Sequence, residues 1–437
     1  MNYSRQVDRI VQYFRKQEKT PDNLKIGAEF EHFIIRGTDL SSVHYEEIDK
    51  NGIRDFLYFL VQKGWRGSFE GDNLIGLEKD GTTVTLEPGA QVELSTQHSS
   101  KLADIENIYM NFLQDVMPWL KDNGQLLFAL GYLPFSKIED IPFIPKQRYV
   151  YMSEYLRTKG KYAINMMKGT ASTQLTLDYL NEEDFSLKFQ VACYLAPLLA
   201  ILTDNSPIFE GKRYRHHALR TNVWLHCDND RCGIIPHAFN KDFGYETYAQ
   251  YILDRPSITL LRDGQLCYTQ DEPFKAIFES DEFTDKELEH VLTMFFPDVR
   301  TKQFIEIRTA DSIPYPLNFA YLALLKGLLY DCKNIKTIHE TVTGCFEFKK
   351  ILKLQKEIIQ KGLKAKACDK DVMEPILKFV NLAKEGLIEE EKKYLDPLYA
   401  LVEMRKNPVT LINEKLDAGF PLKAAIKDSI VNNLLYN

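Results

Sequence analysis

The feature that most constrains the fold of this chain is an acidic stretch in which apolar residues alternate with polar ones. Residues Thr82–Thr96 read TTVTLEPGAQVELST. The apolar residues recur at every second position on both sides of a Pro-Gly pair, which is the period of two half-buried strands joined by a turn. Gln91 and Glu93 share one face of the second strand. Glu87 shares that face if the extended geometry continues through the turn.

Two further stretches place acidic side chains on one face of a predicted strand. The stretch IGAEFEHFII puts Glu29 and Glu31 together, and the stretch FIEIRTAD puts Glu306 beside Arg308. For a single strand, a solvated face is the simpler interpretation. Three such strands spread over the chain favour one sheet whose polar side is a shared site. Because like charges on neighbouring positions repel, the site predicts a hard cation such as magnesium, which prefers oxygen ligands.

Composition limits the classes of protein and partner to be considered. The 437 residues are 44% apolar and 27% charged, with a formal net charge of −7, which is ordinary for a soluble globular protein and argues against a nucleic-acid surface. No apolar run approaches the length of a membrane span, and the N-terminus has no signal-peptide core. The seven cysteines are scattered. We therefore expect a cytoplasmic protein with reduced thiols and no nucleic-acid or membrane partner.

One cluster of possible zinc ligands needs weighing. His226, Cys227, Cys232 and His237 lie within twelve residues of one another. Their spacing matches neither a zinc finger nor a zinc ribbon, because both histidines crowd the same short segment. We interpret this segment as a turn between strands.

The rest of the chain predicts helices and strands without a linker, a repeat or a low-complexity segment. We expect helices over residues 2–19, 45–63, 99–122, 185–202, 245–253 and 285–296, and strands over residues 25–36, 125–130 and 168–178. From residue 318 the pattern is almost entirely helical. The sequence therefore predicts one domain over residues 1–437, with a mostly helical C-terminal part over about residues 318–437.

Two segments are candidates for contacts with a ligand. Residues 141–149, IPFIPKQRY, are rich in proline and predict a loop with a basic and aromatic end. A rigid surface linker is an equal alternative. The stretch KGTASTQLTLD predicts a strand with a row of hydrogen-bonding side chains on one face, among them Gln174. This row suits a polar ligand or plain exposure to solvent.

Acidic strands combined with several arginines point to magnesium and phosphate chemistry. The chain contains neither a P-loop pattern nor a dinucleotide-binding Gly-x-Gly-x-x-Gly after a strand. A bound nucleotide would therefore be held through metal ions, with arginine neutralising the charge that develops during phosphoryl transfer. From the residues alone we predict magnesium-dependent phosphoryl chemistry and no more specific function.

A set of motifs, in order and spacing, resembles the plant-type glutamate–cysteine ligases, a family with many bacterial members. They are IGAEFEHF, TLEPGAQVELS, IPKQRYVYM, MMKGTASTQLTLD, ALRTNVW, DRCGIIP, FPDVRTKQFIEIRTAD and PLNFAYLALLKGLLYD. The resemblance extends from about residue 26 to about residue 387. It implies a carboxylate–amine ligase with a glutamine-synthetase-like sheet. The expected fold is α+β, with a curved antiparallel sheet forming a funnel-shaped active site, helices around it and a helical C-terminal portion.

The resemblance also implies a reaction. The γ-carboxylate of glutamate attacks the γ-phosphate of ATP to give γ-glutamyl phosphate, and the amine of cysteine then displaces phosphate. The product is γ-glutamylcysteine, the first intermediate towards glutathione or a related thiol. The implied cofactor is Mg2+, with Mn2+ as an alternative, and ATP is the co-substrate. The implied partners are small molecules, and the protein is expected to be a monomer or a homodimer.

Site residues are implied by matching the motifs position by position. The implied metal ligands are Glu29, Glu31, Glu93 and Glu306. The implied catalytic residues are Glu306 and Arg308, of which Arg308 touches the transferring phosphate. The implied substrate-binding residues are Arg148, Tyr149, Gln174, Arg220, Trp224 and Arg300. Among these, Arg148 and Tyr149 are expected to close over the substrate, and Arg220 with Trp224 to bind glutamate.

Three departures from the plant pattern matter. Ala171 stands where plant members have a cysteine, so their disulfide switch does not carry over. His32 replaces a lysine between retained glutamates. Ala90 stands where glycine is usual, which bars easy use of a positive φ. Two alternative functions stay open: a γ-glutamyl ligase with another amine acceptor, and a non-catalytic relative that binds nucleotide or amino acid.

Overall fold

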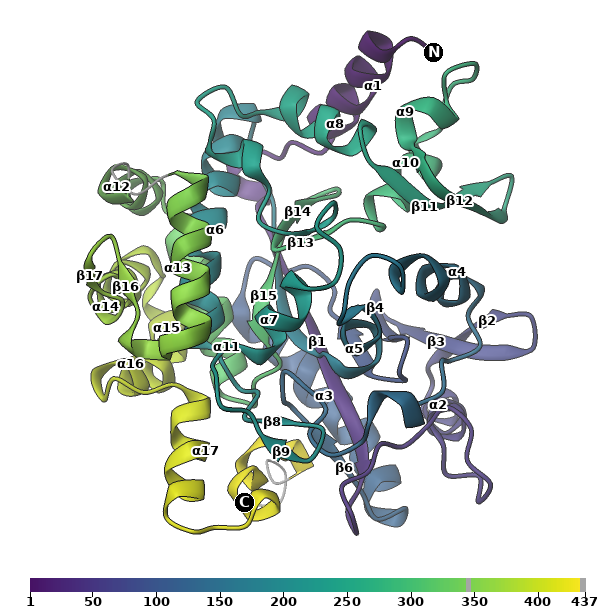
Figure 1. Cartoon of the computed structure of the whole chain (residues 1–437), viewed down its shortest axis with the longest axis vertical. Coiled ribbons are helices and arrows are strands. Elements are labelled where there is room, and N and C mark those ends of the chain that lie inside the picture. Colours follow the sequence, from purple (N-terminus) through teal and green to yellow (C-terminus); the bar gives the residue numbers. More distant parts are fainter. Residues whose placement is uncertain (343–346, 433–437) are drawn as a thin grey trace.

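The computed structural model describes residues 1–342 and 347–432. Within them, nine strands form one central sheet (Figure 1). They are β1 (Ile26–Arg36), β2 (Arg66–Glu70), β3 (Asn73–Lys79), β4 (Thr82–Leu86), β5 (Val92–Ser95), β6 (Gln125–Phe128), β7 (Ser172–Leu177), β14 (Val299–Thr301) and β15 (Ile305–Asp311). Eight follow the order β14-β15-β7-β1-β5-β4-β3-β2, and β6 pairs with β1. All of these pairings are antiparallel, which confirms the predicted antiparallel sheet.

The three acidic stretches come together in this sheet. Glu31 on β1 lies directly opposite Glu93 on β5. Glu29 lies opposite Gln174 on β7, and β7 pairs in turn with β15, which carries Glu306. The prediction that these stretches share one sheet is confirmed.

The other face of β1 belongs to the core. Phe30 is fully buried, and its ring centroid lies 4.6 Å from that of Tyr109 on α3 (Leu102–Asp122) and 5.6 Å from that of Phe319 on α11 (Leu317–Leu329). His32 Nε2 lies 3.1 Å from the Tyr109 hydroxyl on the same side. Alternation along β1 therefore separates a carboxylate face from a face that packs on helices.

Helix α6 (Glu182–Leu202) is the apolar core helix predicted over residues 185–202. By length and composition it could also cross a bilayer, contrary to the expectation that no apolar run is long enough. However, 83% of its apolar window is buried inside the protein, and the helix packs against β15. Its apolar character is explained by this position in the core.

The remaining elements flank the sheet on several sides. One group lies at the top of Figure 1 and comprises α1 (Tyr3–Arg15), α8 (Tyr245–Leu253), α9 (Phe274–Ile277), α10 (Asp285–Leu292), β11 (Pro256–Arg262) and β12 (Gln265–Pro273). Others are α2 (Ile53–Gln62), α7 (Leu219–Leu225), β8 (Ile208–Phe209), β9 (Lys212–Arg213), β10 (Cys232–Gly233) and β13 (Phe296–Pro297). The helices in these two groups, together with α3, α6 and α11, surround the sheet as expected.

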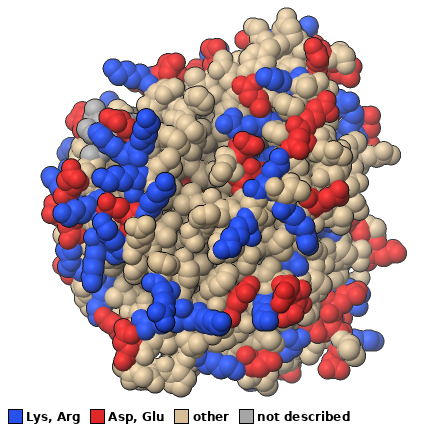
Figure 2. Space-filling model, in the orientation of Figure 1, with Lys and Arg blue, Asp and Glu red and all other residues tan. Residues whose placement is uncertain are grey.

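The C-terminal part is mostly helical, as predicted. After α11 the structure contains α12 (Cys332–Val342), α13 (Phe348–Lys361), α14 (Met373–Gly386), α15 (Glu389–Lys392), α16 (Asp396–Glu403), α17 (Pro408–Asp417) and α18 (Leu422–Ala425). A two-stranded hairpin, β16 (Lys366–Ala367) with β17 (Lys370–Asp371), interrupts the helices. Lys and Arg side chains gather over α13 and this hairpin (Figure 2). The surface is therefore basic here, although the net charge of the chain is negative.

Several local predictions were wrong at their boundaries. The predicted loop over residues 141–149 ends early, because α4 (Gln147–Leu156) begins two residues after Pro145. Proline disfavours helix in the residue before it and in the turn that precedes it, but not in the residues that follow, so the chain becomes helical once the prolines end. The predicted strand over residues 168–178 starts late, since α5 (Ala163–Gly169) occupies its beginning. The predicted helices over residues 45–63 and 285–296 are shorter in the structure, as α2 and α10.

One prediction about the cysteines was also wrong. Cys368 is disulfide-bonded, whereas Cys193, Cys227, Cys232, Cys267 and Cys332 are free, and Cys345 lies outside the described residues. Scattered positions in the sequence do not reveal which sulfur atoms approach one another in space. The described residues contain no group of three His, Cys, Asp or Glu side chains placed to hold a metal by themselves. The segment predicted as a turn between strands instead connects a helix, α7, to a strand, β10.

Candidate active site

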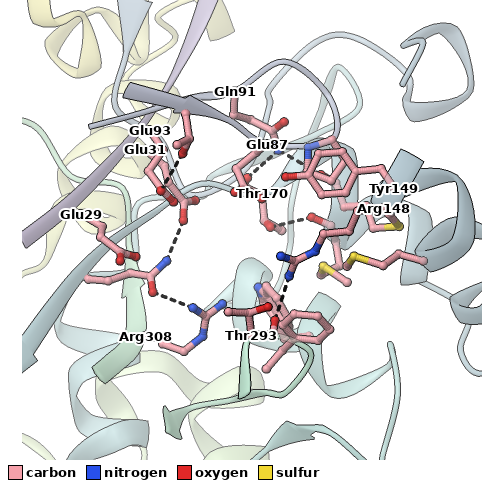
Figure 3. Close-up of a pocket in the computed structure, with 18 of the residues that line it drawn as sticks. Glu29, Glu31, Glu87, Gln91, Glu93, Arg148, Tyr149, Thr170, Thr293 and Arg308 are labelled. Atoms are coloured by element: carbon pink, nitrogen blue, oxygen red, sulfur yellow. Dashed lines mark hydrogen bonds between the residues drawn. The ribbon is translucent and has the colours of Figure 1, made fainter. Parts of the chain in front are cut away.

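A pocket of about 240 Å³ opens on the carboxylate face of the sheet (Figure 3). The sheet forms one side, and α4, α5, α7 and the segment from β13 to β14 form the others. All the predicted site residues line it except Glu306, which is fully buried beside it, and Arg220, which lines an adjoining small cavity. The fold therefore collects residues from six separate motifs around one space.

Four glutamates form a carboxylate cluster on the sheet: Glu29, Glu31, Glu87 and Glu93. Burial, followed by repulsion from neighbouring carboxylates, raises the pKa of Glu29 to about 8 and the pKa values of Glu87 and Glu93 to about 7. Burial also raises the pKa of Glu31, although Arg220 and two hydrogen-bond donors oppose it. The cluster therefore holds more negative charge than its surroundings stabilise, and a bound cation would relieve it.

Glu31 is held in place by β7. It accepts hydrogen bonds from the Ser172 backbone N–H, the Ser172 hydroxyl and Gln174 Nε2, each at 2.7 Å. Gln174 Oε1 accepts in turn from Arg308 Nη1 at 2.8 Å. Figure 3 shows this connection from the cluster to the opposite side of the pocket. Gln174 thus orients both a carboxylate and a guanidinium.

Glu306 is surrounded by cations, whereas each glutamate of the carboxylate cluster has other carboxylates near it. Its carboxylate lies 2.8 Å from Arg300 Nη2, 2.9 Å from Lys302 Nζ and 2.5 Å from Arg308 Nη1. Burial by itself would raise the pKa of Glu306, but these three cations outweigh it and hold the pKa well below its ordinary value. Because cations already occupy its oxygens, the metal-ligand role of Glu306 stays a prediction, and its observed contacts orient the cations.

Five basic side chains form a cationic wall of the pocket: Lys146, Arg148, Arg300, Lys302 and Arg308. Arg148 Nη2 donates to the Thr293 carbonyl at 2.9 Å, while its buried Nε has no partner. Burial and the neighbouring Arg148 lower the pKa of Lys146. Figure 3 shows Arg148 and Arg308 pointing into the pocket across from Glu87 and Glu93. Such a wall fits a polyphosphate or a carboxylate.

Tyr149 and Gln91 hold the pocket together. The Tyr149 hydroxyl donates to the Leu86 carbonyl at 3.0 Å, so in this arrangement it braces α4 against β4. Gln91 Nε2 donates to the carbonyls of Met167 at 3.2 Å and Thr170 at 3.0 Å. The predicted polar position of Gln91 is thus used to fasten the turn after β4 onto the end of α5.

Arg220 and Trp224 lie together on α7. Arg220 Nη1 donates to the carbonyls of Arg308 at 3.0 Å and Thr309 at 3.3 Å. The Trp224 ring lies 5.6 Å from the Arg220 guanidinium and 5.8 Å from that of Arg308. The indole thereby fills the space between the two arginines and separates the main pocket from the small cavity.

Comparison with known proteins identifies the family. Residues 25–342 match the model of the family described as glutamate–cysteine ligase family 2. The chain belongs to this family. The chloroplastic glutamate–cysteine ligases of Nicotiana tabacum and Arabidopsis thaliana are each 30% identical to it, over 436 and 441 residues, and each alignment covers 98% of this chain and 82% of the relative.

A solved structure supports the fold. The crystal structure of a glutamate–cysteine ligase from Francisella tularensis in complex with AMP matches with a TM-score of 0.54. The match covers 95% of this chain and 89% of that one at 13% sequence identity. At this identity the likeness concerns the fold, which is the mixed architecture expected for a glutamate–cysteine ligase.

Three charged residues of the pocket were not among the predicted sites of this glutamate–cysteine ligase family member: Glu87, Lys146 and Lys302. The alternating pattern included Glu87. It was not assigned to the site because the path of the turn at Pro88-Gly89 was unknown. Lys302 lies in the turn between β14 and β15, so strand alternation gave no signal for it. Lys146 had no signal beyond its place in a basic, aromatic segment.

The turn of the family motif also departs from expectation. Ala90 adopts a φ of 68°, in the left-handed region that its side chain was expected to avoid. The turn is closed by hydrogen bonds from the Ala90 N–H to the Glu87 carbonyl at 2.9 Å and from the Glu87 N–H to the Gln91 carbonyl at 3.0 Å. The turn is therefore closed with alanine at a positive φ, at a cost of about 1 kcal/mol in backbone strain.

Proposed function

We propose that this protein is a glutamate–cysteine ligase, which uses ATP to join the γ-carboxylate of glutamate to the amine of cysteine. One observation carries the proposal: a member of this family places a carboxylate cluster and a cationic wall around one pocket. A ligase of this type must bring a carboxylate up to a triphosphate, and both signs of charge are needed to do so.

The first step transfers a phosphoryl group. An oxygen of the γ-carboxylate attacks the γ-phosphorus of ATP, the bond from that phosphorus to the bridging oxygen breaks, and ADP leaves beside γ-glutamyl phosphate. Arg308 neutralises charge on the transferred group, because its guanidinium reaches the pocket and is oriented by Gln174 and Glu306. Arg300 and Lys302, which share Glu306 as a partner, extend the same positive surface.

The second step forms the amide. The neutral amine of the acceptor attacks the acyl carbon, the carbon–oxygen bond to phosphate breaks, and the nitrogen loses a proton. Met152, Met166, Met167 and Phe296 are among the residues that line the pocket. Soft, apolar side chains of this kind suit a thiol better than a charged acceptor side chain, which favours cysteine.

The carboxylate cluster fits magnesium that is bound together with a nucleotide. Magnesium usually takes protein carboxylates and completes its shell with phosphate oxygens and water. Glu29, Glu31 and Glu93, with Glu87 beside them, would hold the ion. The bound ion would supply charge neutralisation for the triphosphate.

We further propose that the protein acts on small molecules in the cytoplasm, as a monomer or a homodimer. The five cysteines that are free among the described residues support the compartment, and the disulfide at Cys368 argues against it. Sedimentation velocity in a reducing buffer measures the oligomeric state, and a larger assembly would contradict this part of the proposal.

Phosphate release from ATP tests the function. We expect release that requires glutamate, cysteine and magnesium together, with γ-glutamylcysteine detected by mass spectrometry. Release that requires glutamate but is not stimulated by cysteine would keep the ligase and replace the acceptor, which a panel of amines would then identify. A folded protein that releases no phosphate under any of these conditions would favour a non-catalytic binding protein.

A further inference from the structure

The segment between α6 and β8 contains a buried carboxyl group that the proposed reaction does not use. Asp204 lies two positions after the end of α6 and is 1% exposed. Its Oδ2 accepts a hydrogen bond from the Ala218 N–H at 2.8 Å. Ala218 directly precedes α7, the helix that carries Arg220 and Trp224 to the pocket and its adjoining cavity. Asp204 therefore holds the beginning of an active-site helix.

The start of α7 depends on this contact from elsewhere in the chain. Ala218 has no polar side chain with which to cap the helix. Its φ is 48°, in the left-handed region that alanine adopts only at a cost in free energy. Ala218 is also buried, so removal of the Asp204 carboxyl group would leave a buried N–H donor unpaired. The strained first turn of α7 is then expected to shift.

A second buried carboxyl group lies near the first. Asp311, at the end of β15, accepts hydrogen bonds from the Asn205 N–H at 2.8 Å and from the Ser206 hydroxyl at 2.6 Å. The donors that contact the two carboxyl groups are backbone amides and this hydroxyl, all of them neutral. The backbone of Gly131 covers Asp311, since a Cβ there would lie 2.1 Å from its Cγ. Two like charges are costly in such buried surroundings, so we expect the pair to retain one proton at neutral pH.

The titratable groups around the pair decide which aspartate keeps the proton. Burial raises the pKa of Asp311 to about 6, although the nearby Arg220 opposes the rise. Burial and then repulsion from Asp311 raise the pKa of Asp204 to about 8. Tyr214, in the segment before α7, stays neutral because burial raises its pKa to about 12. From α17 the contact is the neutral Val409 N–H, which donates to the Asp204 carbonyl at 2.8 Å. The proton therefore lies on Asp204.

A protonated carboxyl group thus holds the start of α7. We propose that Asp204 is a positioning residue for α7 and acts with its proton bound, so that loss of this proton in alkaline solution displaces the first turn of α7 and Arg220 with it. Once both aspartates are ionised, their repulsion moves Asp204, because Asp311 is held by the Asn205 and Ser206 contacts. The inference rests on the proposed function, since it takes α7 as part of the substrate-binding side of the pocket.

The test compares Asp204→Asn with Asp204→Ala at pH 7 and pH 9. Asparagine keeps an oxygen that accepts from the Ala218 N–H and has no titrating proton, whereas alanine removes the acceptor. At pH 7 we expect kcat/KM for glutamate to stay within about threefold of wild type in Asp204→Asn and to fall about 10-fold in Asp204→Ala, chiefly through KM. From pH 7 to pH 9 we expect the ratio of Asp204→Asn to wild type to rise about 10-fold, because about nine-tenths of the wild-type protein has then lost the proton.

This ratio removes the effect of the other titrating groups, including the carboxylate cluster and the acceptor amine, because both proteins share them. Asp184→Asn is the matched control. Asp184 lies at the opposite end of α6, where it accepts from the Leu180 N–H and pairs with Lys188. Its substitution should lower stability without changing the ratio. A ratio that does not rise for Asp204→Asn, or equal activities of the Asn and Ala variants at pH 7, would overturn the proposal.

Hydrogen exchange of the wild-type protein covers the case in which the variants do not fold. After correction for the intrinsic exchange rate, we expect the protection of amides over residues 218–225 to fall about 10-fold from pH 7 to pH 9, while that of α11 stays constant. Constant protection of α7, or an equal loss in both helices, would overturn the proposal. If the protein releases no phosphate from ATP at either pH, the ligase function fails, while the exchange measurement still decides whether α7 loosens when a proton is lost.

Discussion

Two groups of carboxylates lie on the same face of one sheet and behave in opposite ways. On β5, Glu93 lies opposite another glutamate, and burial with repulsion raises its pKa to about 7. On β15, Glu306 is more deeply buried, yet three cations hold its pKa well below the ordinary value. Residue type and burial therefore do not decide the charge state of a glutamate here; the charged side chains around it do. The first group is prepared for a cation that arrives with substrate, and the second is already neutralised by the protein.

The largest expected effect is the loss of Glu306. Glu306→Ala leaves Arg300, Lys302 and Arg308 without their shared carboxylate, so we expect turnover to be abolished. We also expect the free energy of unfolding, measured in urea, to fall by about 3–5 kcal/mol. Lys384→Ala is the matched control, because its ion pair with Asp396 is exposed and its loss should cost less than about 1 kcal/mol. Unchanged turnover in Glu306→Ala would remove this residue from the site.

The corresponding change in the carboxylate cluster should have the opposite effect on stability. Glu93→Gln removes one of the repelling charges, so we expect the substrate-free protein to gain about 1–3 kcal/mol at pH 8. We expect activity to fall at least about 10-fold and the magnesium concentration for half-maximal activity to rise, since a predicted metal ligand is lost. Urea unfolding and magnesium titrations measure the two effects. If Glu93→Gln destabilises as Glu306→Ala does, the comparison between the two groups is wrong.

The pH dependence of stability sharpens the same comparison. The raised pKa values, about 8 for Glu29 and about 7 for Glu87 and Glu93, mean that the folded protein binds protons more tightly than the unfolded chain between about pH 4.5 and 8. This stabilisation is complete below the unfolded-state pKa and is lost as pH rises through the folded-state values. We expect urea unfolding of the substrate-free protein to show decreasing stability from pH 5 to pH 8.

The contribution of the cluster can be isolated within that pH series. Glu93→Gln should have a shallower slope of stability against pH than the wild-type protein over the same range, because one titrating group is gone. Saturating magnesium and ATP should flatten the wild-type slope as well, if the ion binds at the cluster. A slope that neither change affects would assign the pH dependence to other groups.

The smallest expected effect concerns the turn that carries Glu87. Ala90→Gly should stabilise the protein by about 0.5–1 kcal/mol, because φ at this position is 68° and glycine adopts such values without strain. Ala103→Gly, at an exposed position in α3, should instead destabilise by about 1 kcal/mol. Thermal unfolding of the two variants, measured side by side, shows whether each substitution raises or lowers the stability. A destabilised Ala90→Gly would mean that the turn is not strained.

Much of the site could be predicted from local patterns. Alternation placed Glu29 with Glu31 on one face of β1, and even spacing placed Glu306 with Arg308 on β15, because side chains of a strand alternate whatever the strand pairs with. Family motifs added Arg148, Arg220 and Trp224, which line the main pocket or the cavity beside it. Their roles in catalysis and binding remain predictions.

The sequence by itself determined which residues share a strand face, the antiparallel α+β class and the family. Only the tertiary structure decided that Glu31 faces Glu93 while Glu306 faces cations, and that Asp204 meets the start of α7. The physical reason is the range of the interactions. Side-chain alternation is set by the backbone of a few residues, whereas pairing order and register depend on long-range packing, such as that of Phe30 against α3 and α11. Charge state depends on neighbours brought together by that packing.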